Sequence, residues 1–60
     1  MKSTEVEKLL IKNGWKPIRQ LGSHKMFKKT DNEKTIALPM HKRDLPIGTL
    51  NSILKQAGIK

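Results

Sequence analysis

Two short turns divide the middle of this chain, and their spacing constrains the fold more than any other feature. Three stretches have the composition of β-strands: residues 15–21, 24–30 and 34–39. Only Gly22-Ser23 and residues 31–33 separate them. Links this short leave no room for a crossover connection, so each strand must run antiparallel to the next. Pro17 has no backbone N–H, so the first strand is expected at a sheet edge or with a bulge.

A helix is predicted before the strands, over residues 4–13. Thr4 and Glu7 have the S/T-x-x-E spacing of a capping box. Apolar side chains then recur at helical spacing, at Val6, Leu9 and Leu10. Gly14 can adopt the left-handed conformation that ends a helix.

A second helix is predicted after the strands. Asp44 lies just before Pro46 and is expected to cap this helix. Gly58 is expected to close it. The apolar residues at helical spacing are Leu50, Ile53, Leu54 and Ala57.

The order helix, three strands, helix predicts an α+β fold with both helices on one face of the sheet. The chain has 60 residues, which is too short for a second domain, so residues 1–60 are expected to form one domain. A domain of this size buries only about 60% of the surface that its unfolded chain exposes. The core is therefore expected to be a thin layer between the sheet and the helices.

Charge is the strongest compositional signal. Lys and Arg number 13 against 5 Asp and Glu, which gives a formal net charge of +8. Such a field attracts polyanions, and nucleic acid is the first candidate because each neutralised phosphate releases a counterion. An acidic protein is the second candidate. The sequence has no cysteine, which excludes disulfides and thiolate metal sites.

The expected location is the cytoplasm. No apolar run is long enough to span a membrane. Charged residues interrupt the first twelve residues, which lack the apolar stretch of a signal peptide.

Strand alternation predicts what surrounds His24. Phe27 is the only phenylalanine and is expected in the core. Side chains alternate between the two faces of a strand, so Lys25 would share the face of Phe27. His24, Met26 and Lys28 would then lie on the opposite, open face, where a ligand can approach.

Four fragments of the chain, taken in order, resemble the HicA (YcfA-like) toxin family of type II toxin–antitoxin pairs. They are NGW at residues 13–15, GSHKMF at 22–27, ALPMH at 37–41 and GTLNSILKQAG at 48–58. The resemblance extends from about Leu9 to Ile59. It implies a fold like that of the double-stranded-RNA-binding domain, which agrees with the element order predicted above.

The resemblance also implies an activity and a partner. HicA-like toxins are mRNA interferases, which are endoribonucleases that cleave messenger RNA and block translation. The catalytic histidine of the family lies in a Gly-Ser-His motif, which His24 matches here. The partner would be a HicB-like antitoxin that covers the active face. Operator DNA would be contacted only indirectly, through the antitoxin complex.

An imidazole suits this chemistry, because RNA carries its own nucleophile in the 2′-hydroxyl. A histidine can remove the proton of that hydroxyl or protonate the leaving 5′-oxygen near neutral pH. Cations at Arg19, Lys25 and Lys28 can offset the charge that develops on phosphorus. No metal or other cofactor is needed for this route, and none is expected.

Other residues are candidates for smaller roles. Ser23 either completes the turn or hydrogen-bonds a phosphate. Lys42 either binds backbone phosphate or is loop charge. His41 is a candidate second acid–base group, although a loop histidine without a catalytic role is the simpler reading. Trp15 either packs against the first helix, which we favour, or stacks on a base.

Two alternatives to a nuclease stay open from the sequence. The first is a non-catalytic RNA-binding module of the same fold, which recognises shape and phosphates. The second is a protein-interaction domain whose basic face binds an acidic partner.

Overall fold

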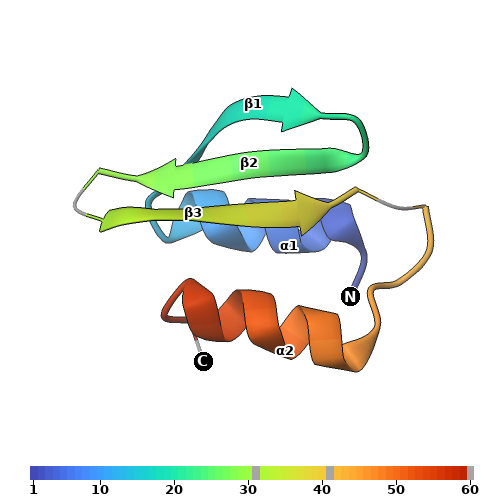
Figure 1. Cartoon of the computed structure of the whole chain (residues 1–60). Helices are drawn as coiled ribbons and strands as arrows, with labels where there is room; N and C mark the ends of the chain where they lie inside the picture. Colours follow the sequence, from blue (N-terminus) through green and yellow to red (C-terminus); the bar gives the residue numbers. More distant parts are fainter. Residues whose placement is uncertain (31, 41, 60) are drawn as a thin grey trace.

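The computed structural model describes residues 1–30, 32–40 and 42–59. Within these ranges five elements follow one another as helix, three strands, helix (Figure 1). They are α1 (Ser3–Lys12), β1 (Trp15–Leu21), β2 (His24–Lys29), β3 (Asn32–Pro39) and α2 (Ile47–Gln56). The strands lie in the order β1-β2-β3 and both neighbouring pairs are antiparallel. The predicted α+β architecture, with the element order of a double-stranded-RNA-binding domain, is confirmed.

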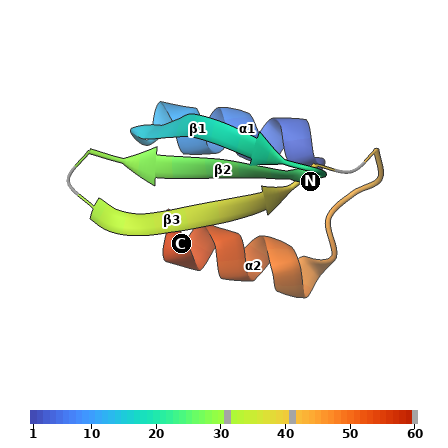
Figure 2. The same ribbon diagram turned by 45° about the horizontal axis from the view of Figure 1, so that its top comes forward.

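Both helices pack against the same face of the sheet and leave the other face uncovered (Figures 1 and 2). The core lies between the sheet and this helical layer. It contains Val6, Leu10, Trp15, Phe27, Ile36, Leu38, Leu45, Ile53 and Ala57. The single layer of large side chains is what a chain of 60 residues can bury.

A bulge interrupts β1 beside Pro17. Pro17 pairs with Phe27 and Arg19 pairs with Met26, so Ile18 is an extra residue on β1. The prediction of an edge strand or a bulge at Pro17 is confirmed in both respects, because β1 also forms one edge of the sheet. The extra residue changes the phase of the alternation. Lys16 and Arg19 are three residues apart, yet both lie on the open face.

Helix α1 begins one residue earlier than predicted, and the Thr4–Glu7 capping box does not form. Lys2 is the N-cap residue, and its backbone N–H donates a hydrogen bond of 3.0 Å to the Glu5 carboxylate. The glutamate that closes the helix start is therefore Glu5. Glu7 is instead used in a tertiary contact that the local pattern does not reveal.

The first residues of the chain hold the end of β3 and the loop after it. The buried Ser3 hydroxyl donates a 2.7 Å hydrogen bond to the carbonyl of Pro39. The Leu45 N–H donates to the carbonyl of Met1 at 2.9 Å. An isolated antiparallel bridge pairs Lys2 with Asp44. These contacts fix the chain on both sides of the connection to α2.

The predicted cap of α2 is wrong. Helix α2 begins at Ile47 with Pro46 as its N-cap, and no side chain caps it. Asp44 lies two residues further back, in the bridge to Lys2. Pro46 still marks the start, because its fixed φ angle suits entry into a helix.

Candidate functional site

A tight turn places His24 at the first position of β2. Leu21 pairs with His24, so Gly22 and Ser23 are the two central residues of the hairpin turn. Gly22 has φ +60° and Ser23 has no positive φ, which is the pattern of a type II′ turn with glycine first. The backbone twist of this turn type matches the twist of the flanking strands, so the turn suits a two-residue hairpin.

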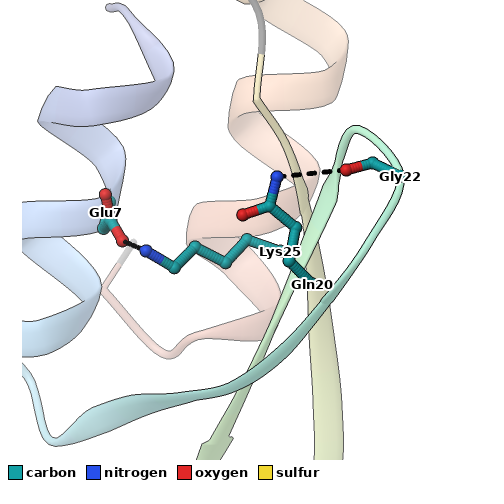
Figure 3. A network of polar contacts seen from close by, with 4 residues as sticks. All are labelled: Glu7, Gln20, Gly22 and Lys25. Atoms are coloured by element: carbon teal, nitrogen blue, oxygen red, sulfur yellow. Dashed lines mark hydrogen bonds and ion pairs between the residues drawn. The ribbon is translucent and has the colours of Figure 1, made fainter.

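Hydrogen bonds hold the turn from both sides. The Gln20 side-chain amide donates to the carbonyl of Gly22 at 3.0 Å (Figure 3). The Met40 N–H donates to the carbonyl of Ser23 at 2.7 Å. The backbone on the N-terminal side of His24 is therefore fixed by its own hairpin and by the chain that leaves β3.

His24 is exposed on the open face of the sheet. Paired residues on adjacent strands share a face, so the register assigns three cross-strand rows to this face. The rows are Leu21–His24–Pro39, Arg19–Met26–Ala37 and Lys16–Lys28–Thr35. The predicted open-face set of His24, Met26 and Lys28 matches this register.

Arg19 is the cation that the register brings nearest to His24 on the open face. It is the diagonal cross-strand neighbour of His24, since His24 pairs with Leu21 and Arg19 precedes Leu21 by two residues. Diagonal neighbours lie about 7–8 Å apart, within reach of a long side chain. Both side chains are exposed. An imidazole and a guanidinium can thus act on one bound group.

Lys25 lies on the other face. Its amine forms an ion pair with the Glu7 carboxylate of α1 (Figure 3). The alternation predicted this face for Lys25, and the structure adds the carboxylate that occupies the amine. Lys25 is therefore not among the cations around His24, whereas Lys28 is exposed on the same face as His24.

The remaining sequence candidates are placed as follows. Ser23 is exposed in the turn, and Lys42 is exposed in the loop after β3. His41 lies outside the described residues. Trp15 is 1% exposed and its indole N–H donates to the carbonyl of Ala57 at 3.3 Å, so it packs in the core as favoured.

Lys16 is a residue that the sequence reasoning missed. It lies directly opposite Lys28 on the open face. The face of Lys16 could have been predicted from the sequence, because a buried Trp15 implies that the next residue of the strand points outward. The position of Arg19 was harder to derive, since it depends on the bulge at Ile18.

The part of the open face formed by β1 and β2 is cationic. Lys16, Arg19 and Lys28 all lie there, and neither β1 nor β2 contains an acidic residue. Glu5 and Glu7 belong to α1, on the covered face. No carboxylate within β1 or β2 opposes these cations, so the electrostatic potential around His24 favours anions.

The described residues form no pocket. They also bring no three His, Asp or Glu side chains together as metal ligands. No helix in the described part of the chain is long and apolar enough to cross a membrane.

One comparison with known proteins identifies a family. The sequence model of the HicA toxin family, described as "HicA toxin of bacterial toxin-antitoxin", matches residues 3–59. This range includes both helices and all three strands of the fold. No protein with a curated description matches the chain.

Proposed function

This chain belongs to the HicA toxin family, and we propose that it is an mRNA interferase, an endoribonuclease that cleaves messenger RNA and so blocks translation. The family is one of toxins in toxin–antitoxin systems, so an antitoxin partner follows from membership. The toxin would act in the cytoplasm, where messenger RNA is translated. As a single domain over residues 1–60, it would carry the whole activity on one sheet face.

The observation that carries the proposal is the position of His24. Its imidazole is exposed on the open, cationic face, directly after a hydrogen-bonded turn. A guanidinium lies diagonally across from it. A proton-transfer group with a cation within reach suits RNA cleavage by transesterification.

The reaction needs two proton transfers and one attack. His24 takes the proton of the 2′-hydroxyl, and the oxygen attacks the adjacent phosphorus. The bond from phosphorus to the 5′-oxygen breaks, and that oxygen takes up a proton from an acid. The products are a 2′,3′-cyclic phosphate and a 5′-hydroxyl. Arg19 offsets the negative charge on the phosphorane, and Lys28 holds the RNA backbone.

The expected rate enhancement depends on the number of acid–base groups in the site. One positioned acid or base contributes about 10²–10⁴-fold. A site with one histidine predicts a modest nuclease, and a second proton-transfer group would raise the rate further. His41 is the candidate for that second group, and water is the alternative. The route uses no metal ion or other cofactor.

A HicB-like antitoxin would neutralise the toxin by covering the open face. Burial of Lys16, Arg19 and Lys28 against a partner requires opposing charge, so the covering surface is expected to be acidic. Such a cover would also block the approach of RNA to His24. Contact with operator DNA would come through the antitoxin complex.

The test is cleavage of a long end-labelled RNA with a chelator present. Wild type, His24→Ala and Thr35→Ala are compared at equal folded concentration, checked by circular dichroism. Thr35 is an exposed, uncharged residue on the same face and serves as the matched control. We expect cleavage by wild type and Thr35→Ala, and a loss of at least about 100-fold in His24→Ala.

Two results would contradict the proposal. Equal cleavage by wild type and His24→Ala would remove His24 from the chemistry and make His41 the next residue to test. Binding of RNA by all three proteins without cleavage, also on translating ribosomes, would favour a non-catalytic RNA-binding module. The open cationic face is compatible with that second function.

A further inference from the structure

Two lysines face each other on the open side of the sheet, at the end away from His24. Lys16 on β1 pairs directly with Lys28 on β2, and both are exposed. Directly opposed like charges destabilise an antiparallel pair. The third member of the row is the uncharged Thr35, so the row offers no carboxylate to compensate.

This row has a defined distance from the catalytic candidate. Lys28 follows His24 by four residues on the same strand and shares its face. At about 3.3 Å per residue, the separation is about 13 Å along the strand. The two lysines are therefore too far away to act on a phosphate that His24 contacts. They are within reach of a more distant phosphate of the same RNA strand.

We propose that Lys16 and Lys28 form a phosphate-binding subsite that holds the RNA strand away from the cleaved bond. The ligand is the phosphodiester backbone of single-stranded RNA, lying along β2 from His24 toward Lys28. This inference deepens the proposed function and rests on it for the direction of the strand. The inference gives Lys16 a role in RNA binding. It also gives the cations of the open face two roles, because Arg19 acts at the reacting phosphate and the lysine pair binds a more distant phosphate.

The opposed lysines give the subsite a distinctive signature. Replacing a residue that is needed for folding lowers the stability of the protein. Replacing one of two repelling lysines instead relieves the repulsion and should raise that stability. Lys28→Glu converts the pair to opposite charges. The same change puts a negative charge where a phosphate would bind. Stability and RNA affinity are therefore expected to move in opposite directions.

The binding test uses a fluorescent single-stranded RNA of about 12 nucleotides with 2′-O-methyl sugars, which lack the nucleophile. Wild type, Lys16→Ala/Lys28→Ala, Lys28→Glu and Lys8→Ala/Lys12→Ala are titrated over a range of salt concentrations. Lys8 and Lys12 are exposed lysines of α1 and make a control of equal charge. Because this RNA cannot be cleaved by attack of its 2′-oxygen, binding is measured apart from catalysis.

We expect the open-face double variant to reduce the magnitude of the negative slope of log affinity against log salt by about 1.4, or about 0.7 for each lost phosphate contact. At about 50 mM salt its affinity should fall at least tenfold. The α1 double variant should fall clearly less. Lys28→Glu should bind more weakly still while its midpoint of thermal unfolding rises above that of wild type.

Three outcomes would overturn the subsite. An equal loss in the α1 variant would mean that RNA responds to net charge or binds the helical side. An unchanged slope in the open-face variant would remove the lysine pair from binding. Wild type that fails to bind RNA at low salt would leave an acidic protein as the ligand of this face. If this second outcome, the unchanged slope, came with a loss of cleavage in His24→Ala, the nuclease would stand and only the subsite would be rejected.

Discussion

The Lys25 amine and the Glu7 carboxylate form an ion pair that joins β2 to α1 (Figure 3). The side chains are 28% and 18% exposed, so solvent screens the pair only in part. His24 is the adjacent residue of the strand, and its side chain points to the opposite face. The two neighbouring residues therefore have different roles. Lys25 links β2 to α1, and His24 faces the side from which a ligand can approach.

Lys25→Met is expected to cost at most about 1 kcal/mol of unfolding free energy, because a partly exposed ion pair contributes little. Its effect on RNA cleavage should be much smaller than that of Lys28→Met, which removes a cation from the open face. Urea unfolding and initial cleavage rates measure the two quantities. If both variants lost the same activity at equal folded fraction, the Lys25 amine would have to reach the RNA.

The fold could be predicted almost completely because its signals are local. The short links at Gly22-Ser23 and residues 31–33 predicted that the three strands pair in antiparallel order along the chain. Pro17 predicted an edge strand or a bulge. The start of α1 was misplaced by one residue because its local cap uses Lys2 and Glu5 in place of Thr4 and Glu7. The predicted cap of α2 was wrong because of a tertiary contact. Asp44 pairs with Lys2, which is far from it in the sequence, instead of capping α2.

The candidate site was predictable to the extent that it depends on simple alternation. Lys28 could be assigned to the face of His24 from the position of Phe27 alone. Arg19 could not, since without a bulge it would share the inward face of Trp15. The Glu7 partner of Lys25 was also hidden, because 18 residues separate them in the sequence.

Gly22→Ala is expected to destabilise the protein by about 1–3 kcal/mol, which is the cost of holding a residue with a Cβ at the positive φ of this turn position. Gly22 has φ +60°, and a Cβ there would meet no atom within 4 Å, so the backbone angle is the only source of strain. Cleavage should fall as well, because the turn positions His24.

Gly48→Ala is the matched control, since Gly48 lies in α2 and a Cβ there also meets no atom within 4 Å. It should stabilise the protein by about 0.5–1 kcal/mol. Chemical denaturation of both variants makes the comparison. A Gly22→Ala protein as stable as wild type would mean that the turn can adopt another geometry.

Trp15→Phe is expected to destabilise the fold by about 1–3 kcal/mol, since it leaves the buried carbonyl of Ala57 without its indole donor. Thermal unfolding measures this loss. The same residue provides a probe, because a tryptophan that is 1% exposed should emit at short wavelength and resist quenching by acrylamide. Addition of RNA should leave that emission nearly unchanged. Strong quenching by RNA would show that the indole stacks on a base.

Arg19→Ala should lower the turnover rate rather than the affinity for RNA, because the guanidinium is proposed to stabilise charge that exists only in the transition state. We expect a fall of at least about tenfold in kcat, with Arg19→Lys retaining part of the rate because it keeps the charge. Steady-state cleavage of one defined RNA separates kcat from KM. The open-face variant Lys16→Ala/Lys28→Ala is the comparison, since it should raise KM and leave kcat nearly unchanged. If Arg19→Ala raised only KM, Arg19 would belong with the two lysines as a binding residue, and His24 would have to act without a neighbouring cation.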